Sequence, residues 1–264
     1  MIDVVHLVWA ALGRRPFERF LDSYRQHSAG AAHRLVLVFK EFHDVDHRRP
    51  WEELASDVDY RRVDIREPAL DLAAYWRVAC SSDASRLCFT NSSSVVLADG
   101  WLAVLDRALE RPHVGIAGAT GSWESTYSAA PIWRKPLLRR SFGPFPNPHI
   151  RTNGFLLDRE LMLSLDWPDV GCDKRAALRL ENGRRGITAQ VRARGSSVVV
   201  VGRDERAYEP PDWPRSGTFR SGEQANLLVA DNRTEQYREA ARERRRELER
   251  FAWGEAVDQS TGSS

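Results

Sequence analysis

The sequence predicts an α/β fold in which a mostly parallel, twisted sheet is flanked by helices and followed by a C-terminal helix. Three observations predict this fold. Apolar runs of strand length recur along the N-terminal third of the chain. Segments with apolar residues at helical spacing lie between these runs. The connections are short, as in parallel βαβ units, and 264 residues are enough to bury a sizeable core.

The first βαβ unit lies at the beginning of the chain. The run Val4–Trp9 is typical of a buried strand, and Pro16 marks the start of a helix. The apolar face of that helix is formed by residues at helical spacing, which are Phe17, Phe20, Leu21 and Tyr24. The unbroken apolar run Leu35–Phe39 predicts a second strand that is buried on both faces.

Two more strands complete the first half of the sheet. We expect a short helix over Pro50–Leu54, a strand over Tyr60–Ile65 and a helix over Pro68–Ser81. The run Leu87–Phe89 predicts a central strand, and its polar tip precedes a helix opened by Asp99. In open α/β sheets, ligand sites lie at the carboxyl ends of strands, where a polar tip connects the strand to the next helix.

The second half of the chain is less regular. We expect strands over Val114–Ala117 and Thr152–Leu157, separated by a small-residue loop, a basic stretch and a segment too rich in proline for a helix. The second of these strands leads into a helix over Asp158–Leu165, whose first residue is a good N-cap. A helix over Ile187–Arg194 and a strand over Ser197–Val201 follow.

The C-terminal part is predicted to be mostly helical. We expect a helix over Glu223–Val229 and a long, solvated helix over Thr234–Trp253, supported by residue pairs of opposite charge at helical spacing. The last residues, 259–264, are expected to be disordered. We therefore divide the chain into a main domain, residues 1–233, and a charged C-terminal helix with its tail, residues 234–264.

Composition argues against several classes of function. The formal net charge is +2, so there is no global case for binding nucleic acid or a membrane. The three cysteines have no CxxC spacing, which argues against a zinc site or a disulfide framework and fits a reducing cytoplasm. We recognise no signal peptide and no apolar run long enough to span a bilayer. We therefore expect a cytoplasmic protein whose contact with a membrane, if any, is peripheral.

The central strand and its tip resemble those of a known family. The run Phe89-Thr90-Asn91-Ser92-Ser93 stands where GT-A glycosyltransferases have a strand similar to "FLNxD", which ends in the acidic DxD motif. The order of elements from Val4 to Val201 is similar to that of family-2-like members. The segment Asp64–Tyr75 also resembles the rhamnan-synthesis type of glycosyltransferase. In this chain both aspartates of the motif are missing.

The resemblance implies a GT-A fold and an enzyme that moves a sugar from a nucleotide-sugar donor to a hydroxyl of a glycan or glycolipid acceptor. It further implies an inverting, hexosyltransferase-like enzyme of polysaccharide or glycoconjugate assembly. The alternative is a catalytically degenerate GT-A module that binds a nucleotide-sugar or glycan, or that scaffolds an assembly. A nucleotidyltransferase is less favoured, because its glycine-rich basic loop is reduced here to Leu12-Gly13-Arg14-Arg15.

Candidate donor-binding residues lie where strands end. Asp64 and Asp71 provide carboxylates that suit ribose hydroxyls, although a turn residue and a helix N-terminal charge explain them equally well. Lys40 ends the second strand and is a candidate phosphate contact, with a solvated lysine as the simpler interpretation. Arg220 lies among small residues that resemble a flexible lid over a diphosphate, with surface charge as its alternative.

The tip residues Asn91, Ser92 and Ser93 occupy the place of the metal-binding motif. Two aspartates there would bind a divalent cation, Mg²⁺ or Mn²⁺, through hard oxygen ligands. Neutral asparagine and serine oxygens make a weak site, so two alternatives stay open. Either other carboxylates complete a metal site, or arginines such as Arg151 and Arg220 neutralise the leaving diphosphate.

An inverting transfer needs a base that takes a proton from the acceptor hydroxyl. Glu181 matches the position of that base in the family, where an acidic motif precedes a helix, while Asn182 replaces the second acid. A carboxylate at a helix entry is the alternative explanation for Glu181. Candidate acceptor contacts, through an aromatic face or through hydrogen bonds to a sugar, are Trp123, Glu124 and Asn153. A buried tryptophan needs no such role.

Overall fold

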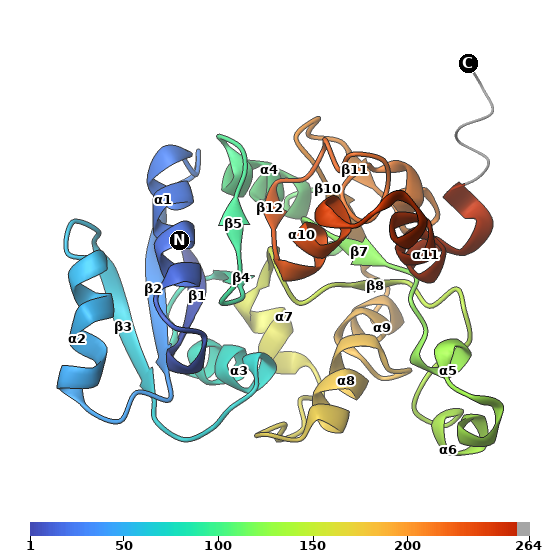
Figure 1. The fold of residues 1–264 in the computed structure, drawn as a ribbon, viewed down its shortest axis with the longest axis horizontal. Helices are drawn as coiled ribbons and strands as arrows, with labels where there is room; N and C mark the ends of the chain where they lie inside the picture. The colour runs from blue at the N-terminus through green and yellow to red at the C-terminus, as the bar shows by residue number, and fades with distance from the viewer. Residues whose placement is uncertain (258–264) are drawn as a thin grey trace.

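An eight-stranded mixed sheet runs through the computed structural model, which describes residues 1–257 (Figure 1). Its strands are β1 (Ile2–Trp9), β2 (His33–Lys40), β3 (Tyr60–Ile65), β4 (Arg86–Thr90), β6 (Val114–Gly118), β9 (Phe155–Asp158), β10 (Ser197–Val201) and β11 (Ala207–Tyr208). Their order is β11-β10-β6-β9-β4-β1-β2-β3. β9 is antiparallel to β4 and β6, β11 is antiparallel to β10, and the other neighbours are parallel. The predicted α/β class with a mostly parallel sheet is therefore confirmed.

Helices cover both faces of this sheet. The α-helices are α1 (Arg15–Gln26), α2 (Val45–Leu54), α3 (Asp71–Ser81), α4 (Trp101–Leu109), α5 (Thr126–Ala129), α6 (Lys135–Leu138), α7 (Arg159–Ser164), α8 (Lys174–Asn182), α9 (Ile187–Ala193), α10 (Asn232–Glu239) and α11 (Arg242–Trp253). Short 3₁₀ turns span Ala10–Leu12, Ile132–Arg134, Pro210–Arg215 and Gly254–Val257. Two small sheets pair β5 (Val95–Val96) with β12 (Val229–Ala230), and β7 (Gly121–Ser122) with β8 (His149–Ile150).

Each face of the main sheet carries its own hydrophobic core. One core joins the sheet to α3, α7, α8, α9 and α11, and the other joins it to α1, α2 and α4. Strand residues alternate between the two, so Val5 and Leu7 of β1 enter the first core while Val4 and Val8 enter the second. Burial on both faces explains why the parallel strands read as unbroken apolar runs.

The N-terminal half agrees with the predicted βαβ units, because β1 to β4 alternate with α1, α2 and α3. Two helix starts differ from the prediction. Helix α2 begins at Val45 rather than Pro50, because the Asp44 side chain caps it by accepting a hydrogen bond from the His47 amide. Helix α3 begins at Asp71, three residues later than expected.

The C-terminal region differs more. The helix predicted over Glu223–Val229 is wrong, since this segment forms turns that lead into β12. The single helix predicted over Thr234–Trp253 is also wrong, because the chain breaks into α10 and α11, with Ala240 and Ala241 in extended conformations. Trp253 is buried in the first core rather than solvated. The tail predicted to be disordered lies outside the described residues.

Two predicted helix caps are not formed. Asp99 does not open α4, because the N-cap of this helix is Gly100, in the left-handed region. The Asp99 carboxylate instead accepts a hydrogen bond from the Ser28 amide. Asp158 stands at the N-cap of α7 but makes no capping hydrogen bond with its side chain. Asp158 thus stands at the predicted position, whereas Asp99 lies one residue before the N-cap and bonds a different segment of the chain. Residues 1–257 contain no helix with the length and apolar character needed to cross a bilayer.

Candidate functional site

Polar side chains gather at the edge where β1, β2 and β4 end. Because these strands are parallel, their carboxyl ends lie at the same edge, and the beginning of the antiparallel β9 lies there too. At the tip after β4, the Asn91 side-chain oxygen accepts hydrogen bonds from the Ser93 amide at 2.9 Å and the Ser94 hydroxyl at 3.2 Å. The tip residues Asn91–Ser94 therefore form a turn that is fixed by its own side chains.

Asn153, just before β9, fastens this tip to the neighbouring strand. Its side-chain oxygen accepts hydrogen bonds from the Asn91 amide at 3.0 Å and from the Ser94 hydroxyl. The side chain is almost fully buried, and its amide nitrogen has no hydrogen-bond partner among residues 1–257. The predicted donor residue Asn91 and the predicted acceptor residue Asn153 are thus direct neighbours.

Lys40 ends β2 and is buried, with only 2% of its side chain exposed. Its ammonium group lies 2.9 Å from the Asp71 carboxylate at the start of α3 and 5.2 Å from the centre of the Trp9 ring. The solvated lysine that we preferred from sequence is therefore wrong, because a buried ammonium needs a charged partner. The Asp71 side chain is 44% exposed, so this pair reaches the protein surface.

Glu181 lies in the last turn of α8 rather than at a helix entry. One of its carboxylate oxygens accepts a hydrogen bond of 3.0 Å from the Thr152 hydroxyl, and the Thr152 carbonyl accepts one from the Tyr75 hydroxyl. Burial raises the pKa of Tyr75 well above its ordinary value, and the charges of Asp71, Glu181 and Asp231 raise this pKa further. The charges of three carboxylates that lie far apart in the sequence therefore act on one buried phenol.

Arg151 and Asp231 form a buried ion pair beside this group. Their closest atoms, Nη2 and Oδ2, are 3.0 Å apart, and Asp231 also caps α10 by accepting hydrogen bonds from the Arg233 and Thr234 amides. Burial by itself raises the pKa of Asp231, but the charge of Arg151 and the Thr234 amide outweigh burial, so the pKa lies below its ordinary value. Asp231 is therefore held as a carboxylate.

Arg220 is a further buried cation in this region. Its guanidinium pairs with Glu124, and it is not on the surface, as a solvated arginine would be. Burial lowers the pKa of Arg220, and the nearby charges of Arg151 and Arg233 lower it further against the opposing charge of Glu124. The charges of Arg151 and Arg233 thus act against that of Arg220, whereas the carboxylates Glu124 and Asp231 favour it. An anion bound here would relieve this repulsion.

Several buried polar atoms in these connected segments have no hydrogen-bond partner among residues 1–257. They are the Ser92 hydroxyl, the Thr120 hydroxyl, the Asn153 amide nitrogen and Nε of Arg220. Thr120 belongs to the group because its carbonyl accepts a hydrogen bond from the Arg151 amide. An unsatisfied buried polar group costs roughly 1–3 kcal/mol, so a ligand or water that bonds these atoms would be favoured.

The donor set at the tip does not suit a divalent cation. Mg²⁺ and Mn²⁺ prefer carboxylates, whereas the tip offers one asparagine oxygen, which already accepts two hydrogen bonds, and serine hydroxyls. Residues 1–257 contain no group of three or more His, Cys, Asp or Glu side chains placed to hold a metal ion. The cations that the structure does provide at this edge belong to arginine and lysine side chains.

Two predicted site residues lie apart from this group. The Asp64 carboxylate pairs with Arg48 at 3.3 Å and Arg62 at 3.2 Å, on the sheet face opposite Lys40. Trp123 is partly buried, donates a hydrogen bond from its indole nitrogen to the Pro210 carbonyl and packs against Trp253. Their roles in donor and acceptor binding stay predictions.

Sequence reasoning did not single out Tyr75, Thr152 and Asp231 as site residues. Tyr75 was visible only as part of an apolar helix face, and its hydroxyl reaches Thr152 across 77 positions of the chain. Asp231 had a local signal, since Asp231-Asn232-Arg233-Thr234 has the spacing of a capping box, which the structure contains. The partnership of Asp231 with Arg151 had no such signal.

The fold is similar to that of solved glycosyltransferase structures. No protein-family model matches the chain, and no curated protein matches it in sequence. The mannosyltransferase PcManGT from Pyrobaculum calidifontis, solved with GDP-Man and Mn²⁺, has a TM-score of 0.53 at 16% identity, over 79% of this chain and 56% of that one. This likeness confirms the GT-A fold. The chain spans little more than half the length of that enzyme.

Two other structures show weaker similarity. GalNAc-T7, solved with UDP, GalNAc and Mn²⁺, has a TM-score of 0.49 at 13% identity, over 76% of this chain and 42% of that one. Glucosyl-3-phosphoglycerate synthase from Mycobacterium tuberculosis, solved with Mn²⁺, UDP and phosphoglyceric acid, has a TM-score of 0.42 at 16% identity, over 62% and 58% of the two chains. The assignment of the fold does not depend on these two.

Proposed function

We propose that the protein is a glycosyltransferase that moves a sugar from a nucleotide-sugar donor to a hydroxyl acceptor with inversion at the anomeric carbon. The GT-A fold supports this class, since PcManGT with the same fold was solved with GDP-Man. The polar groups gathered at the carboxyl edge of the sheet lie where open α/β sheets bind ligands. A glycan or glycolipid is the acceptor class that the sequence resemblance implies.

The position of Glu181 carries the proposal. A carboxylate in the last turn of a helix faces the negative end of the helix dipole, which disfavours it. Within residues 1–257, its only hydrogen bond is the one from the Thr152 hydroxyl. A side chain that weakens its own helix but lies beside Tyr75 and the Asn153 region is better explained by chemistry than by stability.

In the proposed reaction, Glu181 accepts the proton of the acceptor hydroxyl as the acceptor oxygen attacks the anomeric carbon. The bond between that carbon and the phosphate oxygen breaks, and the nucleoside diphosphate leaves with the bonding electrons. Thr152 orients the carboxylate of Glu181 through its hydrogen bond. The free amide nitrogen of Asn153 is a donor for a sugar hydroxyl or a phosphate oxygen.

We infer that arginines, rather than a divalent cation, neutralise the departing diphosphate. Arg220 and Arg151 supply the positive charge, and each already pairs with one carboxylate, Glu124 and Asp231 respectively. Nε of Arg220 is a donor without a partner among the described residues. The backbone of Arg220 has φ of +42°, a strained value for a residue other than glycine, which is typical of functional positions.

A donor screen tests this function. The melting temperature of the protein is measured with UDP-, GDP-, dTDP- and CMP-sugars, each in EDTA and each with Mn²⁺. We expect one nucleotide class to raise the melting temperature in EDTA, because binding to the native state stabilises it by mass action. Stabilisation that requires Mn²⁺ would contradict the arginine site, and no stabilisation by any donor would contradict the proposed function.

A further inference from the structure

A short segment at one corner of the molecule exposes several large apolar side chains. Ile132, Trp133 and Leu137, in the turn before α6 and in α6, are 82%, 70% and 80% exposed. In Figure 1, α5 and α6 lie at the lower right of the molecule, away from the main sheet. Single exposed apolar residues are common, but a cluster with a tryptophan marks an interaction surface.

The same segment carries cations and no acids. Arg134, Lys135, Arg139 and Arg140 alternate with the apolar residues, and the chain has no Asp or Glu from residue 125 to residue 157. Arg134 lies 5.2 Å from the centre of the exposed Trp133 ring. We call these seven residues, three apolar and four cationic, the α6 patch.

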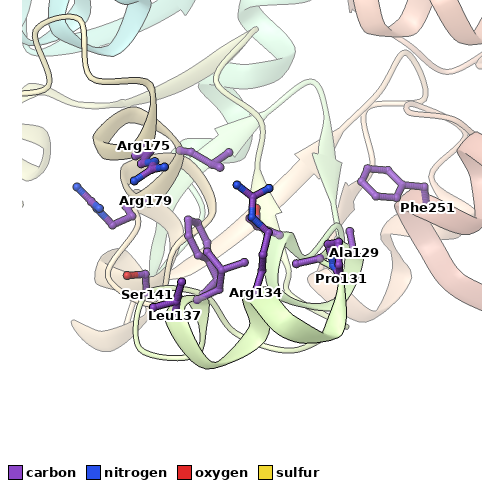
Figure 2. Close-up of a pocket in the computed structure, with 13 residues that line it drawn as sticks. Ala129, Pro131, Arg134, Leu137, Ser141, Arg175, Arg179 and Phe251 are labelled. Atoms are coloured by element: carbon purple, nitrogen blue, oxygen red, sulfur yellow. The ribbon is translucent and has the colours of Figure 1, made fainter.

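A groove of about 570 Å³ continues the α6 patch toward α8. Its lining combines apolar side chains of both segments with arginines. Figure 2 shows Arg175 and Arg179 of α8 on one side of the groove and Arg134 on the other. Leu137 of the patch and Phe251 of α11 also line it, so the exposed apolar surface extends beyond α6 itself.

We propose that the α6 patch docks the protein on the surface of an anionic membrane. Trp and Leu side chains enter the boundary between headgroups and acyl chains, and Lys and Arg pair with anionic headgroups. Charge complementarity favours this occupant, since a stretch with four cations and no carboxylate matches a uniformly negative surface. A protein partner is less suited, because it would have to offer both an acidic surface and a cavity for three side chains that protrude from the surface.

Docking through this patch has a geometric consequence. Helix α8 lines the groove with Arg175 and Arg179 and carries Glu181 in its last turn. The Thr126 hydroxyl at the start of α5 also donates a hydrogen bond of 3.4 Å to Asn182, the neighbour of Glu181. The patch and the Glu181 region are therefore connected by one helix. The inference itself concerns membrane binding and does not depend on the proposed reaction.

Vesicle cosedimentation of the full chain tests the proposal. The vesicles are phosphatidylcholine alone or phosphatidylcholine mixed with phosphatidylglycerol. One variant replaces the apolar residues by Ile132→Ser, Trp133→Ser and Leu137→Ser, and a second replaces Arg134, Lys135, Arg139 and Arg140 by Gln. Because all seven side chains belong to a protruding surface segment, both variants should keep the melting temperature of the unmodified protein.

Matched controls change exposed residues elsewhere. Leu12→Ser with Val45→Ser removes apolar side chains that are 43% and 57% exposed, and the Gln variant of Arg14, Arg15, Arg111 and Arg242 removes four cations. We expect the unmodified protein and both controls to sediment with the anionic vesicles only. Each cation near an anionic surface strengthens binding roughly fivefold, so the four-Gln patch variant should lose most of its binding.

The proposal is overturned if the unmodified protein stays in solution with the anionic vesicles. It is equally overturned if both patch variants bind these vesicles as well as the controls do. Binding that is equally strong on phosphatidylcholine alone would also contradict it, because the charge argument requires anionic lipid. These readouts need no donor and no turnover, so they stand apart from any test of glycosyl transfer.

Discussion

Buried cations distinguish the carboxyl edge of this sheet from an ordinary protein surface. Lys40 and Arg220 are both buried, and each has a carboxylate as its partner. Removing a charged side chain from water is costly, so a fold keeps such a group only where a partner or a ligand compensates. For Arg220, burial is the main effect that disfavours the charge, and its Nε has no hydrogen-bond partner among residues 1–257. A buried cation with a donor left without a partner is the physical reason to expect an anionic ligand.

Replacing Arg220 should weaken binding of the diphosphate selectively. Arg220→Gln removes a charge-assisted hydrogen bond, so we expect affinity for the nucleoside diphosphate to fall roughly ten- to hundredfold. Affinity for the corresponding nucleoside should hardly change, since the guanidinium addresses the phosphates. Calorimetry of both ligands measures the difference. Arg220→Lys should retain part of the affinity, and Arg215→Gln, an exposed position in the same segment, should retain all of it.

The sequence predicted site residues where a local pattern marks them. Glu181 and the tip residues were proposed because their positions follow a strand or precede a helix, which is visible along the chain, and their roles stay predictions. Lys40 was placed correctly at a strand end, but its burial was not foreseen, because its partner Asp71 is 31 positions away. The pairing of Arg151 with Asp231 spans 80 positions. Contacts of this kind depend on the folded arrangement and leave no periodic signal.

Helices and strands with a strong apolar period were predicted well. The arrangement of the elements in the second half of the chain was not. The first four strands have local apolar runs and short connections, so their parallel order follows from simple rules. The antiparallel insertion of β9 between β4 and β6 depends on long-range pairing. At the C-terminus, charge spacing predicted one solvated helix, but Tyr237 and Trp253 are both buried, and the break between α10 and α11 allows this.

The packing of α11 predicts a large effect of truncating Trp253. Its ring is buried beside Trp123, and its indole nitrogen donates a hydrogen bond of 2.8 Å to the Phe219 carbonyl. Trp253→Ala should lower the free energy of unfolding by about 3–5 kcal/mol, because it leaves a cavity in the first core. Urea unfolding measures the change. Phe251→Ala, two residues away and half-exposed, should cost far less. Equal effects of the two variants would contradict this packing.

Stability toward acid is a property of the whole molecule. We expect the buried His6 to account for much of the loss of stability between about pH 6.5 and pH 3. The ring is stacked on Phe20 with 3.5 Å between centroids, and burial lowers the pKa of His6 to about 3. Between about pH 6.5 and pH 3 the unfolded chain binds a proton at this position and the native chain does not. The free energy of unfolding should therefore decrease as the pH is lowered across this window, by up to about 1.4 kcal/mol per pH unit.

His6→Asn isolates this contribution, because asparagine does not titrate. Urea unfolding at about pH 7 and at about pH 4.5 gives the loss of stability on acidification for both proteins. The variant should lose less than the unmodified protein over this interval, whatever its stability at neutral pH. An equal loss in the two proteins would show that His6 is not the group responsible. Below about pH 4, protonation of Asp231, whose pKa is lowered, should reduce stability further in both.

The central claim is that this GT-A fold transfers a sugar with Glu181 as the base, and turnover of Glu181→Gln tests it most directly. Glutamine keeps the shape and the hydrogen bond to Thr152 but cannot accept the acceptor proton. We expect turnover to fall ~10²–10⁴-fold, while donor affinity stays unchanged and the melting temperature stays the same or rises slightly, because a neutral side chain suits the end of α8 better. Full turnover in this variant would contradict the assignment of the base. Absence of turnover in the unmodified protein with every donor and acceptor pair would instead favour a binding module.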